Sequence, residues 1–198
     1  GKPLISWTIK SAMGSKKIND LIVSTDDEDI ASISKSFGAE VPFLRPKNLA
    51  NDDTSSFAVV RHTIKELIKQ NRNYEYIILL QPTSPLRQTK HINQSIKLLH
   101  EKKANAIISL SKSSSNPLWS NTIPKSHSLK KKKKKDSLSK RSQEFPDFYS
   151  LNGAIFIAKI DELLKKKNFF LIDKTYAYIM NQKYSIDIDT MEDFFIAE

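Results

Sequence analysis

The amino-acid sequence predicts an α/β fold built on a doubly wound, mostly parallel sheet. Short apolar runs with the character of strands alternate with segments whose apolar residues recur at helical spacing. Parallel strands need a crossover about as long as a helix, so this alternation is typical of such sheets. The length of 198 residues suits one domain with a sizeable core. We therefore expect a single domain over residues 1–198.

The first half of the chain contains the first strand and helix of this alternation. The chain opens at a helix start, with Pro3 in the first turn. Residues 21–24 form a short apolar run that predicts a strand. The acidic residues 27–29 then begin a helix, which Gly38 ends.

The alternation continues to the end of the sequence. A brief extended piece at residues 41–43 precedes an amphipathic helix, for which Asp53 or Thr54 is the expected cap. The remaining elements are strands over residues 76–80, 106–110, 154–158, 176–180 and 184–188, and helices over residues 89–102, 160–165 and from Thr190 onward.

The positive charge of the chain is concentrated in one segment. The formal net charge is +10, but nine basic residues and one acid between Lys125 and Arg141 account for +8 of it, which leaves +2 elsewhere. This segment lies within residues 111–149, where Ser, Asn, Pro and a lysine run at 130–135 interrupt the alternation. We expect a mobile basic excursion there, and a nucleic acid is an unlikely partner of the nearly neutral remainder.

The composition excludes several classes of protein. There is no cysteine, so disulfides and thiolate zinc sites are excluded. No apolar run approaches the ~20 residues of a membrane-spanning helix, and we expect a cytoplasmic protein without a membrane partner. The four glycines are too scattered to write either of the usual glycine-rich phosphate loops.

Three polar clusters follow predicted strands directly, at Asp26, Gln81 and Asp189. Ligands of open parallel sheets bind outside the carboxyl ends of the strands, so these positions are candidates for one site. Residues 81–87 place an amide, two hydroxyls and a guanidinium in a turn framed by prolines. The competing interpretation is an ordinary turn, because prolines and hydroxyl residues are good turn formers.

Asp187 and Asp189 stand two apart on a predicted strand. Their carboxylates would leave the same face and could share one hard cation such as Mg²⁺. The competing interpretation is helix capping, with Asp189 or Thr190 as the N-cap and Asp193 completing a box-like pattern.

Four motifs together make the chain resemble a known family. They are STD at residues 24–26, LQPTSPLR at 80–87, NGAI at 152–155 and SIDIDT at 185–190. In this order they closely resemble the acylneuraminate cytidylyltransferases, also called CMP-sialic acid synthetases. The resemblance spans nearly the whole chain. It implies a Rossmann-like nucleotidyltransferase fold and the transfer of CMP from CTP to a nine-carbon nonulosonic acid, with release of pyrophosphate.

The resemblance also implies roles for individual residues. Asp187 and Asp189 would hold Mg²⁺, Arg45 and Ser56 would contact the cytosine ring, and Gln81 and Asn152 would contact the sugar acid. The blander interpretation of Arg45 is a surface ion pair with Asp52 or Asp53, and that of Ser56 is a first-turn helix residue. We assign the catalytic roles to Asp189, Asp187 and Gln81.

A pair of phenylalanines bears on the oligomeric state. Phe169 and Phe170 are similar to a segment that reaches into the sugar pocket of the neighbouring subunit, which implies a homodimer with a dimerisation excursion. The alternative is that both are core residues. Two positions depart from the family, because Ser142 and Ser150 stand where it usually has arginines. The family's N-terminal phosphate loop is also absent, so the sequence reads as a fragment.

Three alternatives to this function stay open. The nearest is a deoxyoctulosonate-type cytidylyltransferase. The second is a non-catalytic basic module whose lysine run binds RNA or an anionic surface, although that run lacks the interleaved aromatic residues that stack on single strands. The third is an inactive remnant of the enzyme fold.

Overall fold

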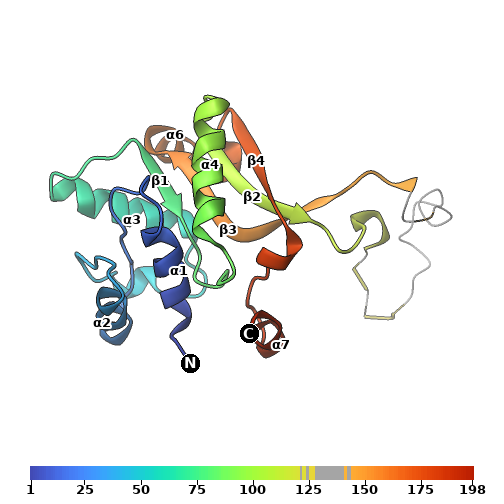
Figure 1. Ribbon diagram of the computed structural model, residues 1–198, viewed down its shortest axis with the longest axis horizontal. Coiled ribbons are helices and arrows are strands. Elements are labelled where there is room, and N and C mark those ends of the chain that lie inside the picture. Colours follow the sequence, from blue (N-terminus) through green and yellow to red (C-terminus); the bar gives the residue numbers. More distant parts are fainter. Residues whose placement is uncertain (121, 124, 128–140, 142–143) are drawn as a thin grey trace.

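The computed structural model describes residues 1–120, 122–123, 125–127, 141 and 144–198. Three α-helices come before the first strand, and from that strand onward strands and α-helices mostly alternate, as expected (Figure 1). They are α1 (Leu4–Met13), α2 (Glu28–Ser36), α3 (Ser56–Lys69), β1 (Tyr76–Leu79), α4 (Thr89–Glu101), β2 (Ala106–Lys112), β3 (Tyr149–Lys159), α6 (Ile160–Lys166), β4 (Thr175–Met180) and α7 (Met191–Ala197). Short 3-10 turns include Phe169–Leu171 and Gln182–Tyr184.

A four-stranded sheet in the order β1-β3-β2-β4 forms the centre of the fold (Figure 1). β2 and β4 are parallel, whereas β3 is antiparallel to both β1 and β2. Three strands therefore run in one direction and β3 runs against them. β3 pairs directly with β2, the strand that precedes it in the chain, as its antiparallel neighbour.

Helices cover both faces of the sheet, which confirms the doubly wound α/β prediction. On one face, Ile107 of β2 and Ile157 of β3 belong to a buried cluster with Ile92 of α4. On the other face, Ile108 belongs to a second cluster with Ile64 of α3 and with side chains of α6. Successive strand residues serve opposite clusters because side chains alternate across a strand.

The strand predicted early in the chain, at residues 21–24, is absent, and the extended piece expected at residues 41–43 does not form a strand either. Residues 21–24 make a single parallel bridge, between Ile22 and Glu40, and residues 41–43 are irregular. Neither segment is hydrogen-bonded into the four-stranded sheet. An apolar run predicts burial, but it becomes a strand only where a neighbouring backbone is available.

The strand predicted over residues 184–188 is also wrong. Gln182–Tyr184 is a 3-10 turn, and residues 185–188 are irregular. The side chain of Asn181 accepts a hydrogen bond from the N–H of Lys183 at 3.1 Å, which favours the turn. Asp187 consequently lies in an irregular segment that other elements must hold in place.

Residues close in sequence to each helix determine where it begins and ends. Asp27 caps α2 by accepting from the N–H of Ile30 at 2.8 Å, and Gly38 beyond this helix has a φ of 94°. For α3 the cap is Ser55, one residue later than expected. Thr190 and Asp193 form the predicted capping box at the start of α7.

The connection between β2 and β3 projects away from the body (Figure 1). It begins as a continuation of the two strands, with the N–H of Ser113 donating to the C=O of Phe148 at 2.8 Å. Further out, the rings of Trp119 and Phe145 lie 5.6 Å apart. The lysines at 130–135, as well as Ser142, lie outside the described residues.

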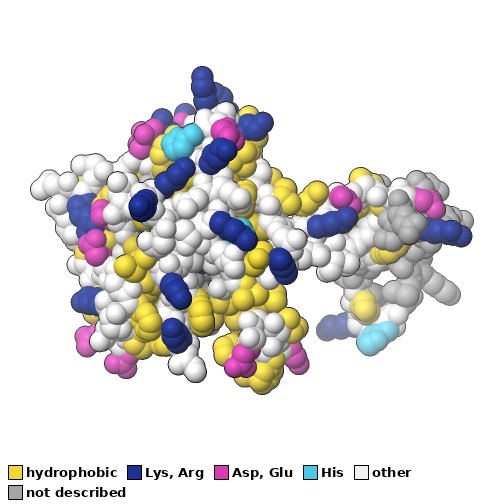
Figure 2. Space-filling model, viewed as in Figure 1, with side chains coloured by type: hydrophobic (Ala, Val, Ile, Leu, Met, Phe, Trp, Pro, Cys, Tyr) yellow, Lys and Arg dark blue, Asp and Glu magenta, His cyan; other side chains and the backbone are white. Residues whose placement is uncertain are grey.

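The surface charge and the helix lengths bear on the predictions about nucleic-acid and membrane partners. In the view of Figure 2, Lys and Arg side chains are spread over the body rather than gathered into one patch. Within the described residues, no helix combines the length and the apolar character that crossing a membrane requires.

Candidate active site

A bulge in β3 shapes the candidate site. As β2 advances two residues, from Ile108 to Leu110, the partner residue on β3 shifts by five, from Phe156 to Leu151. Ser109 Oγ fills the interrupted ladder: it donates to Asn152 Oδ1 at 2.6 Å and accepts from the N–H of Ile155 at 2.8 Å. One serine thus supplies hydrogen bonds that the backbone of β2 cannot reach across the bulge.

Gln81 and Asp187 meet over Gly153 in this bulge. Gly153 has a φ of 67°, the left-handed region that favours glycine. A Cβ atom at this position would lie 2.6 Å from Gln81 Oε1 and 2.8 Å from Asp187 Oδ2. The missing side chain lets two predicted site residues, from the turn after β1 and from the segment before α7, approach the same point of β3.

One carboxylate oxygen of Asp187 has no hydrogen-bond donor among the described residues, although the backbone beside it is fixed. The N–H of the next residue, Ile188, donates to the C=O of Thr83 at 2.8 Å, which ties this segment to the turn after β1. Asp187 Oδ1 is buried and has no hydrogen-bond partner among the described residues. A buried anionic oxygen without a donor is costly unless a cation is bound, so this oxygen fits a metal ligand.

Asp189 lies in a different environment from Asp187. It is exposed, and its N–H donates to Asp193 Oδ2 at 3.2 Å. Because residues 184–188 are not a strand, the predicted reason for both carboxylates sharing one face is wrong. The capping interpretation is confirmed for Thr190, which is the N-cap of α7. The side chain of Asp193 accepts from the backbone N–H of Thr190, so the carboxylate of Asp189 is not needed for capping and stays available.

Asn152 is buried rather than exposed to a ligand. Only 3% of the residue is exposed, and its Nδ2 donates to Ser185 Oγ at 3.0 Å while its Oδ1 accepts from Ser109. Its amide therefore joins β2, β3 and the segment that carries Asp187. Both ends of the Asn152 amide are thus hydrogen-bonded within the protein. A direct contact between Asn152 and the sugar stays a prediction.

Arg87 turns inward from its loop, contrary to the expectation that its guanidinium faces a ligand. It is 2% exposed and donates to the C=O of Ala154 at 2.8 Å, the C=O of Gln81 at 3.1 Å and Thr8 Oγ1 at 2.6 Å. Burial lowers the pKa of Arg87 to about 10. The guanidinium fixes the turn that carries Gln81 against α1 and β3. Ser84 of the same turn is also fully buried.

Among the described residues, no hydrogen bond or ion pair joins Arg45 or Ser56 to Gln81 or Asp187. Arg45 pairs with Asp26 at 3.2 Å rather than with Asp52 or Asp53, and its guanidinium holds the pKa of Asp26 below the usual range. Its Nε is buried without a hydrogen-bond partner among the described residues. Ser56 is an exposed residue at the start of α3.

The two phenylalanines have different environments. Phe169 is 6% exposed and packs on Phe156 with ring centres 5.7 Å apart, so the core interpretation is confirmed for this residue. Phe170 is 52% exposed and only its edge approaches Phe156. The ring contacts of both residues are with Phe156.

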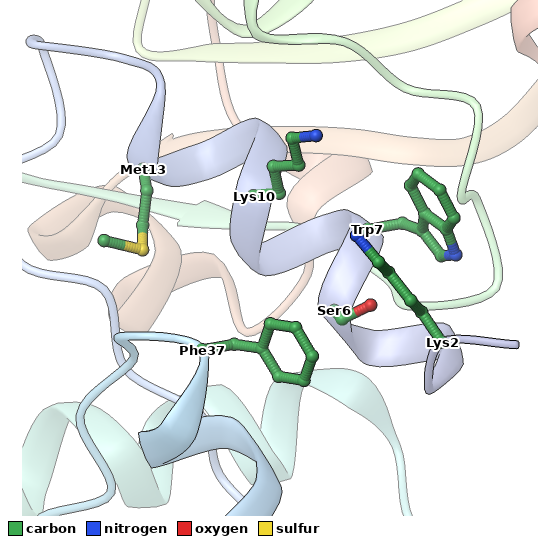
Figure 3. Close-up of a pocket in the computed structure, with 6 residues that line it drawn as sticks. All are labelled: Lys2, Ser6, Trp7, Lys10, Met13 and Phe37. Carbon is green, nitrogen blue, oxygen red and sulfur yellow. The ribbon is translucent and has the colours of Figure 1, made fainter.

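A separate pocket of about 250 Å³ lies beside α1 and contains none of the predicted residues (Figure 3). Trp7 and Lys2 stand together at one side of it, and Phe37, which follows α2, stands across from them. Neither Gln81 nor Asp187 lines this pocket, and it is therefore not part of the candidate site.

A family comparison decides how this arrangement should be interpreted. The sequence model of one protein family, described as cytidylyltransferase, matches residues 1–196. The chain belongs to the cytidylyltransferase family. The match covers all four motifs, including the residues that meet over Gly153.

Individual relatives agree with this membership. This cytidylyltransferase is 34% identical to a CMP-N,N'-diacetyllegionaminic acid synthase of Legionella pneumophila, over 100% of the chain and 84% of that protein. It is 35% identical to an N-acylneuraminate cytidylyltransferase of Escherichia coli, over 99% of the chain but only 45% of that protein. The chain therefore spans about half the length of some relatives.

Solved structures agree on the fold. A CMP:2-keto-3-deoxy-manno-octonic acid synthetase complexed with CTP superposes with a TM-score of 0.67 at 14% identity, over 100% of this chain and 87% of that one. A 4-diphosphocytidyl-2C-methyl-D-erythritol synthase from Anaerococcus prevotii superposes with a TM-score of 0.64 at 17% identity, over 100% and 85%. These likenesses confirm the Rossmann-like nucleotidyltransferase fold of this cytidylyltransferase.

Sequence reasoning missed two supporting residues of the cytidylyltransferase site, Ser109 and Ser185. A signal existed for Ser109, which is the one polar residue in the apolar run predicted as a strand over residues 106–110. Buried polar groups are nearly always hydrogen-bonded, so such a residue predicts a specific partner. Ser185 carried no comparable signal, because its partner Asn152 is 33 residues away in sequence.

Proposed function

We propose that the chain transfers CMP from CTP to a nonulosonic acid, with release of pyrophosphate. The anomeric hydroxyl of the sugar acid attacks the α-phosphorus, a new P–O bond forms, and the bond to pyrophosphate breaks. The observation that carries the proposal is the meeting of Gln81 and Asp187 over Gly153. The names of the legionaminic, neuraminic and pseudaminic acid relatives support the substrate class.

Asp187 and Asp189 are the proposed ligands of Mg²⁺. The buried, unpartnered Oδ1 of Asp187 supports this role, as does the exposed carboxylate two residues later. Mg²⁺ commonly uses one or two carboxylates together with phosphate oxygens and water, so a larger acidic cluster is not required. Bound Mg²⁺ would neutralise charge that develops on the α-phosphate and on pyrophosphate.

Arg45 is the proposed cytosine contact, together with Ser56. Cytosine offers acceptors at O2 and N3, which suit a guanidinium with several donors. The pairing with Asp26 holds the side chain of Arg45 in one place, and its unpartnered Nε supports a further ligand contact. Ser56 lies at the exposed N-terminus of α3, where a hydroxyl is accessible.

Gln81 is the proposed direct sugar contact, and Asn152 acts through the segment it holds. The exposure of Phe170 supports a contribution from the partner chain of a homodimer, with Phe169 as its buried support. Catalysis then depends mainly on positioning and on charge neutralisation, as is usual in phosphoryl transfer. We place the reaction in the cytoplasm, where CTP is available.

The test is pyrophosphate release from CTP and Mg²⁺ with a panel of acids: N-acetylneuraminic, N,N'-diacetyllegionaminic and deoxyoctulosonic acid. We expect release with at least one nine-carbon acid and little with the eight-carbon one. Preference for the eight-carbon acid would establish the alternative cytidylyltransferase. No release with any acid would overturn the proposal.

A further inference from the structure

A polar pocket of about 430 Å³ lies where β2 and β3 leave the body, beside the 3-10 turn at Gln182–Tyr184. Six of its eight lining residues are serines; the other two are Lys112 and Gln182. The serines come from the end of β2 and the loop after it, from Ser150 of β3, and from Ser185. The lining is rich in groups that both donate and accept hydrogen bonds.

The pocket is joined to the candidate active site. Ser185 lines the pocket and also accepts from Asn152 Nδ2 at 3.0 Å. Asp187 follows two residues later in the same irregular segment. On β2, Ser109 and Ser111 are two apart and therefore lie on one face, so hydroxyls run from the buried bulge to the pocket.

The hydroxyls of Ser111 and Ser150 are among those of the pocket that are free to meet a ligand. Ser111 and Ser150 are direct partners in the antiparallel ladder, so their side chains lie next to each other. Neither hydroxyl makes a hydrogen bond to a described residue. The side chains of Ser113 and Gln182 instead form hydrogen bonds within the lining of the pocket. Ser113 Oγ donates to the C=O of Ser115 at 2.6 Å, and Gln182 Nε2 donates to the C=O of Lys112 at 2.7 Å.

The pocket offers no unpaired cation among the described residues. Lys112 is its one charged lining residue, and Lys112 Nζ lies 2.6 Å from Asp147 Oδ1. A carboxylate placed there would give up hydration without gaining a charged partner. Uncharged hydroxyl or amide groups would instead exchange water for serine hydroxyls at little cost.

We propose that this serine pocket binds the uncharged three-carbon side chain of the sugar acid, and not its carboxylate. The inference rests on the proposed function. In a nonulosonic acid the carboxylate is on the anomeric carbon, which must lie at the reacting end near Asp187. The side chain is attached across the ring oxygen from the anomeric carbon and extends away from the ring by three carbons. Ser185 joins the pocket to the segment that carries Asp187.

The first test compares the double variant S111A/S150A with wild type in the pyrophosphate assay. Two probes are used: N-acetylneuraminic acid and its seven-carbon analogue shortened by periodate oxidation and reduction. Each lost neutral hydrogen bond should raise the KM for the intact sugar roughly fivefold, while the KM for CTP stays unchanged. The shortened analogue should be affected much less. An equal change for both probes, or no change, would overturn the inference. The exposed Ser32 of α2 supplies a matched control, S32A.

The second test introduces the charge that the pocket lacks. S150R should raise the KM for N-acetylneuraminic acid, because the guanidinium would fill the space in which the uncharged side chain of the sugar binds. A lower KM would mean that the pocket holds the carboxylate. If wild type releases no pyrophosphate, saturation-transfer NMR with N-acetylneuraminic acid decides the inference separately: side-chain protons should be saturated in wild type and not in S111A/S150A. Absent or unchanged saturation would overturn it.

Discussion

Gln81 Oε1 and Asp187 Oδ2 both lie within 3 Å of the point that a Cβ of Gly153 would occupy. These residues are separated by more than 100 positions in sequence. Their proximity depends on a glycine with positive φ in a strand bulge. The absence of one side chain thus determines how the polar groups of two distant segments are placed.

Gly153→Ala should therefore reduce turnover strongly. The Cβ displaces Gln81 and Asp187, and the positive φ adds strain of about 1 kcal/mol. Gly38→Ala is the matched control, because Gly38 also has positive φ but its Cβ would meet the flexible end of Met13. Pyrophosphate release and thermal unfolding of both variants check this. Similar turnover of the two would contradict a special role for Gly153.

Asp187→Asn should lower turnover about 100-fold or more, because several kcal/mol of charge stabilisation is at stake. Without metal, the variant should be at least as stable as wild type, since a buried carboxylate oxygen without a donor is removed. Asp189→Asn should also lose most activity without loss of fold. The measurements are Mg²⁺-dependent kinetics and metal-free chemical unfolding. Substantial Mg²⁺-dependent activity in both variants would refute the metal assignment.

Arg87→Met should destabilise the fold by about 3 kcal/mol, because three buried acceptors lose their donor. The turn that carries Gln81 should then move, so the KM for the sugar acid should rise as well. Arg61→Met, at an exposed position of α3, is the control. Urea unfolding measures the difference, and equal stability of the two variants would rule out the proposed support of the turn.

Stability should fall on acidification through His91. Burial, together with the charges of Lys90 and Arg87, lowers the pKa of His91 from 6.5 to about 4, and its Nδ1 accepts from the N–H of Gln88. The unfolded chain therefore binds a proton between these values that the folded protein does not, so stability is lost as pH falls from about 6.5 towards 4. At pH 5 the loss is about 2 kcal/mol.

The comparison for this prediction is His91→Asn, in which an amide oxygen can replace Nδ1. Its free energy of unfolding should change less between pH 7 and pH 5 than that of wild type. His100→Asn, at an exposed position of the same helix, should behave like wild type. An identical pH dependence in all three proteins would show that His91 is not responsible.

Deleting residues 130–135 tests the binding-module alternative. The lysines account for much of the net charge, while the motifs of the site lie elsewhere in the sequence. The deletion should leave the KM for CTP unchanged at physiological salt. RNA binding that disappears with the lysines, in a protein without transferase activity, would favour the alternative.

The sequence by itself determined the α/β class and most elements, because each long helix has a local period and local caps. Asp27 and Gly38 around α2, and Thr190 with Asp193 at α7, act within a few residues of one another. The motifs around Gln81 and Asp187 also identified the family and the candidate residues, since these are properties of residue order.

Only the tertiary structure decided which of these residues meet. The strand predicted at 184–188 failed because Asn181 caps a 3-10 turn there and the N–H of Ile188 donates to the C=O of Thr83 in the turn after β1, not to a strand. The same limit hid the inward turn of Arg87 and the bond from Ser109 to Asn152, which join residues far apart in sequence. Local spacing carries no information on such long-range contacts, because they depend on how the packed elements fit together.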